Sequence, residues 1–248
     1  MASPLAQRGL SLAGWTDARL PSGVRQRLTL ARAHAFRFVT LDAMDPQTRP
    51  RDLDRSSRRD LGVTLRREGL ACCGFDLWIP PAEVAMSSNW QRIVDSVEQC
   101  ASCLRQISDE GGSINMSLVE GECEPLIESL HAVCQRHGVV VSDHAWPARD
   151  DERLTIGFDP ATIIASGRDP HDELALVASR VGSLRLSDLD ASGRVAVGRG
   201  SVEPVALEAS SSALGCVCPW VVDVRGVPDQ REAIEIGSAP IVEPGSTG

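Results

Sequence analysis

Residues 138–159, GVVVSDHAWPARDDERLTIGFD, contain two short apolar runs, each followed directly by an aspartate. The runs Gly138 to Ser142 and Leu154 to Phe158 are rich in aliphatic and β-branched residues, which is typical of strands buried on both faces of a parallel sheet. Only about ten residues separate them, which is near the lower limit for a crossover between parallel strands. We therefore predict two neighbouring parallel strands whose connecting helix is reduced or missing.

Similar runs recur along the chain, and amphipathic segments separate them. In the segment Trp90 to Ile107, apolar residues recur at three- and four-residue steps, as they do along the buried stripe of a helix. The segments Leu61 to Leu65 and Leu126 to Cys134 repeat this pattern and end near Gly69 and Gly138, which are typical helix stops. Strands that alternate with helices predict βα units and a parallel sheet. The candidate strands are Leu10–Trp15, Phe36–Leu41, Ala71–Trp78, Ser113–Val119, Gly138–Ser142, Leu154–Phe158, Ser183–Leu186 and Trp220–Val224.

Eight alternating strands predict an α/β fold of the (β/α)₈ TIM-barrel type, compact, with its fifth helix reduced or missing. A length of 248 residues suits one such domain. We place this domain at residues 9–236 and expect residues 1–8 and 237–248 to be flexible ends.

Charge and composition exclude several classes of function. The formal net charge of −9 disfavours partners such as nucleic acids and anionic membranes. The sequence contains neither lysine nor tyrosine, which excludes a Schiff-base or pyridoxal-phosphate lysine, a Walker phosphate loop and a phenolic general acid. We find no signal-peptide pattern and no apolar stretch of the ~20 residues that span a membrane. We therefore expect a cytoplasmic protein whose cysteines are reduced.

Aspartates lie at or near the ends of six of the predicted strands, at the end of a barrel that carries its reactive groups. They are Asp42, Asp76, Asp143, Asp159, Asp188 and Asp223. Each one alone is explained by the preference of aspartate for turns and helix N-caps. Together at one rim, however, like charges repel one another and need a cation, which is either a metal ion or arginine. His144, next to Asp143, is the one histidine that we expect in this site.

Several segments resemble the xylose-isomerase-like sugar phosphate isomerases and epimerases. The segment IGFDPATIIASGRDP (156–170) is similar to the family's strand-six signature, and WVVDVRG (220–226) is similar to strand eight. The segments SLRLSD (183–188) and GRGS (198–201) are similar to strand seven and the glycine-rich loop beyond it, and RRDL (58–61) with EGL (68–70) fits the approach to strand three. The resemblance spans roughly Leu10 to Glu235. It implies a TIM barrel that isomerises or epimerises a small sugar or sugar phosphate.

The resemblance also implies a divalent metal (Mn, Mg, Zn or Co), held by a strand-five glutamate, a strand-six aspartate, a strand-seven histidine and a strand-eight glutamate. Only Asp159 matches outright. Strand five offers Asp143, or His144 if the register shifts; Arg185 takes the histidine position and Asp223 the last glutamate position. Because arginine has only donors and cannot ligate a metal, we expect Arg185 to hold Asp159 or Asp223 through bidentate contacts. The alternative is a metal bound by Asp143, Asp159 and Asp223 together with water.

These considerations give two sets of candidate residues. The candidate catalytic residues are Asp143, Asp223 and His144. The candidate substrate-binding residues are Arg185, Arg199, Trp15 and Asp76. Arg199 belongs to the loop GRGS, whose backbone N–H groups are candidates for holding a phosphate. The alternative for this loop is that Ser201 is simply the N-cap of the next helix.

Two functions remain open at this point. The first is an isomerase or epimerase acting on a small sugar or sugar phosphate with a degraded metal site. The second is a non-catalytic barrel, a pseudoenzyme that binds a small polar or anionic ligand. A metal-dependent nuclease is disfavoured, because it needs more histidines and a basic face.

Overall fold

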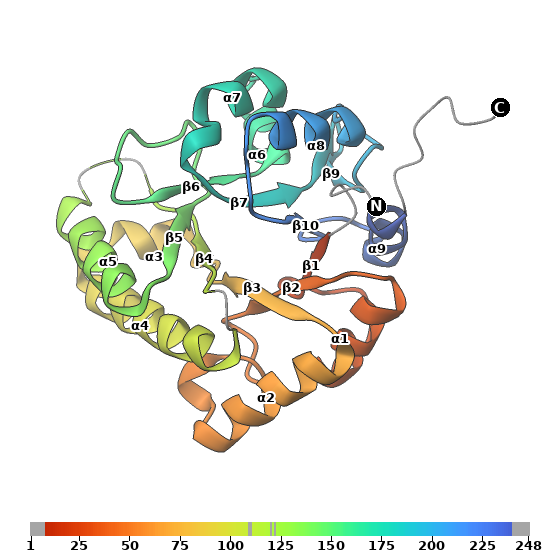
Figure 1. The fold of residues 1–248 in the computed structure, drawn as a ribbon. Coiled ribbons are helices and arrows are strands. Elements are labelled where there is room, and N and C mark those ends of the chain that lie inside the picture. Colours follow the sequence, from red (N-terminus) through yellow and green to blue (C-terminus); the bar gives the residue numbers. More distant parts are fainter. Residues whose placement is uncertain (1–7, 109–110, 120, 122, 240–248) are drawn as a thin grey trace.

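The computed structural model describes residues 8–108, 111–119, 121 and 123–239. Eight parallel strands close into a barrel in the order β1-β10-β7-β6-β5-β4-β3-β2, and the helices surround this barrel (Figure 1). The barrel strands are β1 (Gly9–Ser11), β2 (Phe38–Asp42), β3 (Ala71–Asp76), β4 (Ser113–Met116), β5 (Val140–Asp143), β6 (Thr155–Phe158), β7 (Val181–Leu186) and β10 (Trp220–Val222).

The predicted (β/α)₈ barrel is confirmed, and each of the eight predicted runs contributes one barrel strand. The boundaries differ by a few residues. The first strand ends at Ser11 rather than Trp15, because the chain turns at Gly14, whose φ of 69° is easily adopted only by glycine. The seventh strand begins at Val181, two residues earlier than the sequence predicts.

The helices follow the amphipathic segments of the sequence. The stripe predicted for α4 is buried against the barrel. Helix α2 is capped at its N-terminus by Asp54, whose side chain accepts a hydrogen bond from Ser57 N, and at its C-terminus by Gly69 in the left-handed conformation. The helical elements are α1 (Val24–Ala33), η2 (Pro50–Asp52), α2 (Arg55–Glu68), α3 (Pro81–Ala85), η3 (Ser87–Asn89), α4 (Trp90–Ile107), α5 (Glu124–His137), α6 (Pro160–Ala165), α7 (Pro170–Val177), η4 (Ala178–Arg180), α8 (Pro204–Ala213) and α9 (Gln230–Ser238).

No helix lies between β5 and β6, so the predicted loss of the fifth helix is confirmed for residues 144–154, all of which the structure describes. Phe158 precedes the inward-facing Asp159 and therefore lies on the outer face of β6. Trp146 packs edge-to-face on Phe158 with ring centroids 6.2 Å apart, and Phe158 packs in the same way on Trp220 at 6.1 Å. These aromatic contacts cover a face of the barrel that a helix would normally cover.

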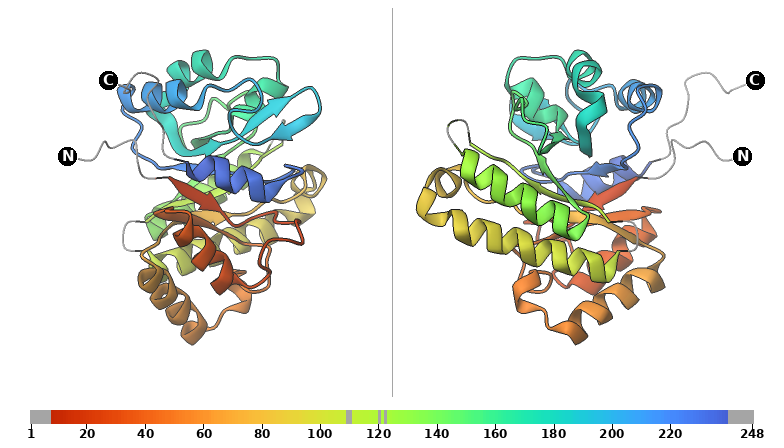
Figure 2. Two further views of the ribbon diagram at one scale, coloured as in Figure 1. Left: turned by 90° about the vertical axis from the view of Figure 1, so that its right-hand side faces the viewer. Right: turned by 60° about the vertical axis from the view of Figure 1, so that its left-hand side comes forward.

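A short antiparallel hairpin between β7 and α8 was not predicted. It consists of β8 (Asp188–Asp190) and β9 (Gly193–Val195), and it projects from the barrel in the left view of Figure 2. Each strand has three residues, too few for an alternating pattern to stand out from a polar loop. The hairpin matters for the site because it carries Arg194.

Within the described part of the chain, no helix is both long and apolar enough to cross a membrane. The C-terminal helix α9 extends to Ser238. Residues 1–7 and 240–248, which make up most of the ends predicted to be flexible, lie outside the described residues.

Candidate functional site

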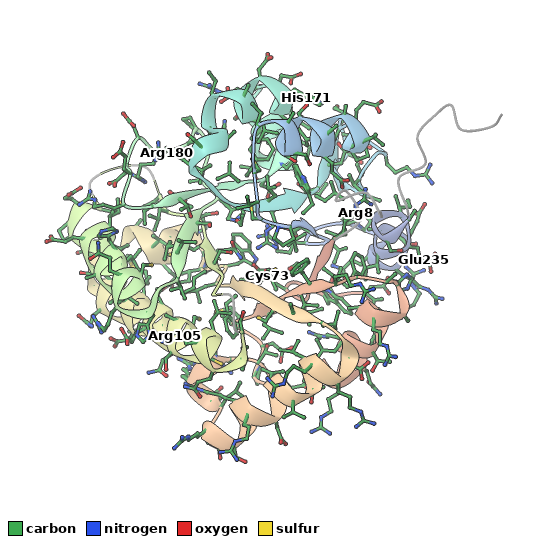
Figure 3. The ribbon with its side chains drawn as sticks, in the orientation of Figure 1. Arg8, Cys73, Arg105, His171, Arg180 and Glu235 are labelled. Atoms are coloured by element: carbon green, nitrogen blue, oxygen red, sulfur yellow. The ribbon has the colours of Figure 1, made fainter. Side chains whose placement is uncertain are left out.

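The interior of the barrel contains a buried ion pair between Asp76 on β3 and Arg185 on β7, which we call the inner pair. Both side chains are 0% exposed, and Arg185 Nη2 donates to Asp76 Oδ1. Asp76 Oδ2 also accepts hydrogen bonds from the hydroxyls of Ser11 (2.6 Å) and Thr40 (2.8 Å), and Oδ1 accepts one from Asn115 Nδ2 (2.9 Å). Figure 3 shows that side chains fill the interior of the barrel. Donors from four strands thus converge on a single carboxylate.

The expected contact of Arg185 with Asp159 or Asp223 is wrong. Arg185 lies beside Val221 in the register of β7 and β10, so Asp223 comes two residues later and one inward-facing layer nearer the mouth. The guanidinium instead crosses the barrel to Asp76. Both residues were predicted to bind substrate, but both side chains are fully buried and bound to each other, so neither is exposed to a ligand at the mouth.

Two other arginines hold the carboxylates at the mouth. We call Asp159, Asp223, Arg194 and Arg225 the mouth cluster. Arg194 Nη1 lies 3.2 Å from Asp159 Oδ2, and its Nη2 lies 3.5 Å from Asp223 Oδ2. Arg225 Nε donates to both oxygens of Asp223 at 3.0 and 2.9 Å, and Arg225 Nη2 lies 3.7 Å from Asp159 Oδ2. Each guanidinium therefore bridges the two carboxylates.

Neither arginine of the mouth cluster was among the predicted site residues. Arg225 follows Asp223 by two positions in WVVDVRG, and residues two apart on a strand lie on the same face, so the sequence did contain this signal. Arg194 reaches the cluster only through the β8–β9 hairpin. The sequence contained no comparable signal for it.

Opposing effects set the protonation of the two carboxylates. Burial acts most strongly and favours the neutral form of Asp159, but the charges of Arg194 and Arg225 and a hydrogen bond from Ser187 (2.5 Å) outweigh it and lower the pKa to about 2. Burial is also the largest influence on Asp223, and the same two arginines again outweigh it and lower the pKa. Both carboxylates are therefore ionised at neutral pH, and their charges cancel those of the two guanidiniums.

Trp78 contacts both the inner pair and the mouth cluster. The guanidinium carbon of Arg225 lies 3.5 Å from the centroid of its ring system, and that of Arg185 lies 5.6 Å away. Cations are attracted to the electron-rich face of an indole. Trp78 therefore helps to hold Arg225 in place beside Asp223.

Strand β5 presents His144, not Asp143, to the interior of the barrel. His144 Nε2 lies 2.9 Å from Ser183 Oγ and 3.3 Å from Asn115 Oδ1. The ring fits only because residue 157 is glycine, since a Cβ atom at Gly157 would meet the ring at 2.2 Å. Burial, followed by the positive charge of Arg185, lowers the pKa of His144 well below its ordinary value. The imidazole is therefore neutral.

Asp143 faces the loops outside the barrel. Its Oδ1 accepts hydrogen bonds from Leu118 N (2.9 Å) and Ala145 N (3.0 Å), and Arg149 Nε lies 3.6 Å from Oδ2. Burial raises the pKa of Asp143 against the effect of these hydrogen bonds. The shifted register that was left open for strand five is therefore the observed one, with His144 in the inward position.

The glycine-rich loop after β9 binds a carboxylate of the protein itself. Asp188 Oδ2 accepts from Gly198 N (2.9 Å) and Gly200 N (2.8 Å), and Oδ1 accepts from Ser201 N (2.9 Å) and Val202 N (3.1 Å). These are the N–H groups that were considered for a phosphate. The alternative role of Ser201 as an N-cap is wrong, because α8 begins at Pro204.

The remaining predicted residues lie around this end of the barrel. Arg199 is exposed, and its guanidinium contacts Glu232 on α9 at 3.2 Å. Trp15, after β1, donates to the carbonyl of Ser11 at 2.9 Å and packs under Arg27. Asp42 accepts from Met44 N at 2.7 Å, and burial raises its pKa.

The residues at the mouth do not fit a divalent metal. Among the described residues, no three His, Cys, Asp or Glu side chains lie close enough together to hold one. Asp159 and Asp223 share two guanidiniums, and Asp143 faces away from them. The alternative ligand set of Asp143, Asp159 and Asp223 is therefore not assembled.

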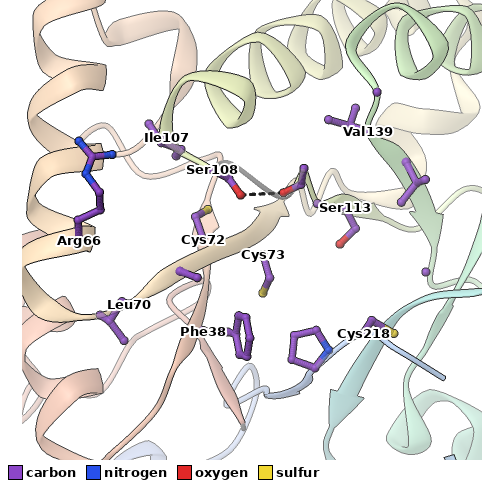
Figure 4. A pocket seen from close by; sticks show the side chains of 17 residues that line it. Phe38, Arg66, Leu70, Cys72, Cys73, Ile107, Ser108, Ser113, Val139 and Cys218 are labelled. Carbon is purple, nitrogen blue, oxygen red and sulfur yellow. Dashed lines mark hydrogen bonds between the residues drawn. The ribbon is translucent and has the colours of Figure 1, made fainter. Parts of the chain in front are cut away.

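A separate cavity of about 440 Å³ lies at the opposite end of the barrel, where the strands begin (Figure 4). Its lining includes Phe38, Cys73 and Cys218. Burial raises the pKa of both thiols to about 12. Because a protonated thiol is a poor nucleophile and a poor metal ligand, the mouth is the stronger candidate for a functional site.

No protein-family model and no curated protein sequence matches the chain. Solved structures do match it. A xylose isomerase domain protein from Planctomyces limnophilus has a TM-score of 0.71 at 16% identity, covering 93% of this chain and 92% of that one. A sugar phosphate isomerase/epimerase from Parabacteroides distasonis has a TM-score of 0.68 at 11% identity, covering 96% and 93%.

A third solved structure, an IolI protein with a bound zinc atom, has a TM-score of 0.71 at 13% identity, covering 94% of this chain and 96% of that one. At such low identities, structural likeness establishes the fold and leaves the activity open. The predicted resemblance is confirmed at that level: this chain has the fold of the xylose-isomerase-like TIM barrels.

Proposed function

We propose that the barrel mouth is a metal-independent binding site for a small anion, such as a phosphorylated or carboxylated sugar derivative, and that the metal site of isomerase-like barrels is degraded here. One observation carries this proposal: Arg194 and Arg225 bridge Asp159 and Asp223, the carboxylates at two of the expected ligand positions. A guanidinium has only donors and repels a metal cation, so both cannot occupy this place.

The exposure of the mouth cluster supports an anionic ligand. The side chains of Arg194 and Arg225 are 21% and 22% exposed, whereas those of Asp159 and Asp223 are 3% and 0% exposed. A ligand that enters the mouth therefore meets N–H donors before it meets carboxylate oxygens. Guanidinium groups bind carboxylate and phosphate through two parallel hydrogen bonds.

Isomerase or epimerase chemistry without a metal is the second candidate, and the neutral imidazole of His144 favours it. A buried neutral histidine can accept a proton from a substrate carbon or hydroxyl. Asp223 is less suited to that role, because Arg225 and Arg194 lower its pKa and make it a weak base. Asp143, the other predicted catalytic carboxylate, faces the loops. Ligand binding therefore has more support than turnover.

The proposed partner is a small molecule, and neither nucleic acid nor a membrane belongs to the proposal. The net charge of −9 supports this choice, because both polyanionic surfaces would be repelled. The eight cysteines are free thiols, which supports a cytoplasmic location as a further part of the proposal.

Metal content and thermal melting test the proposal. We expect the purified protein to contain no stoichiometric metal and to show no rise in Tm with Mn²⁺, Co²⁺ or Zn²⁺. Inorganic phosphate should raise the Tm by binding the folded state. Arg194→Gln should abolish the phosphate effect, and Arg199→Gln, at an exposed arginine nearby, should retain it. Stoichiometric metal, or stabilisation by a metal and not by phosphate, contradicts the proposal.

A further inference from the structure

Two ring nitrogens next to the mouth cluster, His144 Nδ1 and Trp78 Nε1, are buried and have no hydrogen-bond partner in the part of the chain that the structure describes. The two rings lie edge to face, with centroids 5.1 Å apart and an interplanar angle of 76°. His144 is 3% exposed. Buried polar groups in folded proteins are nearly always paired, so unpaired nitrogens on two neighbouring rings indicate a place for a polar group of a ligand.

Asn115 determines which nitrogen of His144 carries the proton. Asn115 Nδ2 donates to Asp76 Oδ1 (2.9 Å) and to the carbonyl of Phe75 (3.3 Å), which fixes the orientation of the amide. Its Oδ1 therefore faces His144 Nε2 at 3.3 Å, and an amide oxygen can only accept. We therefore place the proton on Nε2, from which the hydroxyl oxygen of Ser183 at 2.9 Å can also accept. Since the ring is neutral, Nδ1 is a hydrogen-bond acceptor.

Trp78 supplies the complementary group, because an indole N–H is only a donor. A donor on one ring and an acceptor on the neighbouring ring suit a hydroxyl group, which accepts from the indole and donates to the imidazole. A carboxylate oxygen or an unprotonated phosphate oxygen could not satisfy the imidazole, since it has no hydrogen to donate.

The position of Trp78 connects this pair to the anion site. Arg225 covers the face of the indole at 3.5 Å and is itself 22% exposed to the mouth. Trp78 is also only partly buried. A ligand whose anionic group is held by Arg225 therefore brings its next few atoms towards Trp78 and His144.

We infer that Trp78 and His144 bind one hydroxyl group of the ligand, so that the mouth selects hydroxylated anions, such as sugar phosphates or hydroxy acids, over their deoxy counterparts. This inference rests on the proposed anion site and names the class of molecule that the site takes. It assigns to Trp78 and His144 a role in specificity that the charges of the mouth cluster cannot provide.

Titration calorimetry with two matched pairs of anions tests the inference. Glycerol 3-phosphate is compared with propyl phosphate, and malate with succinate, because each pair differs in hydroxyl groups and shares its anionic groups. We expect the hydroxylated member of at least one pair to bind about tenfold more tightly or better, since a site that binds a hydroxyl rejects the analogue without one.

Two tryptophan variants locate the effect. Trp78→Phe keeps an aromatic face under Arg225 and removes the N–H, so it should abolish the preference while anions still bind. Trp90→Phe is the matched control, because its N–H donates to the carbonyl of Val84 on the outside of the barrel. It should keep the preference. If Trp78→Phe does not fold, the shift of the Trp78 indole N–H resonance on addition of glycerol 3-phosphate, and not of propyl phosphate, gives the same information.

The outcomes separate the two proposals. Equal affinities within both pairs overturn the hydroxyl inference and leave the anion site intact. Failure of every anion to bind, inorganic phosphate included, overturns the proposed function and the inference with it. Nitrogen NMR shifts of His144 give an independent check, because a proton on Nδ1 in place of Nε2 would remove the acceptor and contradict the inference.

Discussion

The barrel contains two sets of buried aspartate–arginine contacts that differ in what surrounds them. The inner pair of Asp76 and Arg185 is closed off from solvent, and hydroxyl and amide donors complete the hydrogen bonds of its carboxylate. In the mouth cluster the carboxylates are as deeply buried, but the arginines are about one-fifth exposed. The inner pair therefore has the features of a structural element, and the mouth cluster has those of a site that can exchange partners with a ligand.

The largest expected effect comes from breaking the inner pair. Arg185→Met should lower the free energy of unfolding by about 3–5 kcal/mol, because it leaves the carboxylate of Asp76 buried without its counter-ion. Urea unfolding measures this change. The double variant Arg185→Met/Asp76→Asn removes both charges and should recover part of the loss. If the single variant is as stable as the parent, or the double variant recovers nothing, the inner pair is not the structural element described here.

Gly157→Ala tests how firmly the ring of His144 is held beside the two sets. A Cβ atom at this position would meet three atoms of the His144 ring at 2.2–2.4 Å, so the ring or strand β6 has to move. We expect a loss of about 2–3 kcal/mol, in the upper range for overpacking a core. Gly23→Ala is the control, because its Cβ would meet only ordinary contacts of 3.4 Å and longer. A melting temperature equal to that of the control would show that His144 is held less firmly than its contacts indicate.

The sequence was sufficient to predict the barrel because strand formation depends on local patterns. Apolar runs such as Leu154 to Phe158, separated by amphipathic helices, are present in the sequence itself. The missing fifth helix could be predicted from the length of one connection. The three-residue strands β8 and β9 could not, because nothing in so short a stretch distinguishes a hairpin from a loop.

The site could be predicted only in part, for a physical reason. Aspartates at strand ends must meet at one end of a barrel, so the proximity of Asp159 and Asp223 followed from the fold alone. Which arginine neutralises them depends on the reach of long side chains from non-neighbouring elements. Arg185 was the natural choice from its position in strand seven, but it lies one layer too deep, and Arg194 approaches from the unpredicted hairpin. Long-range pairing of this kind has no signature in a single sequence.

The mouth cluster should respond to acid through Asp159. Its pKa is lowered from the ordinary 3.8 to about 2 in the folded state. A lowered pKa means that the ionised group stabilises the fold above about pH 4, and that this contribution is lost as the pH falls from about 4 towards 2. The contribution is of the order of 2 kcal/mol, since the shift is about two units.

The measurement compares the free energies of unfolding of the parent and Asp159→Asn from about pH 7 to about pH 3. The advantage of the parent should be largest near neutral pH and should shrink towards pH 3. Asp150→Asn, at a fully exposed carboxylate, controls for the loss of one charge. An advantage that stays constant over this range would show that the arginines of the mouth cluster do not hold Asp159 as an ion.

The smallest effect is expected at Arg199, which the sequence placed in a phosphate-binding loop. Its guanidinium contacts Glu232 at 3.2 Å, and the two side chains are 63% and 51% exposed. Exposed ion pairs contribute less than about 1 kcal/mol, so Arg199→Gln should change the free energy of unfolding by less than about 0.5 kcal/mol. Its loop uses its N–H groups for Asp188, so phosphate affinity should also be unchanged. A clear loss of phosphate affinity in this variant would place the anion site at the loop and not at the mouth cluster. It would then contradict the distinction between a closed inner pair and a mouth cluster that exchanges partners with a ligand.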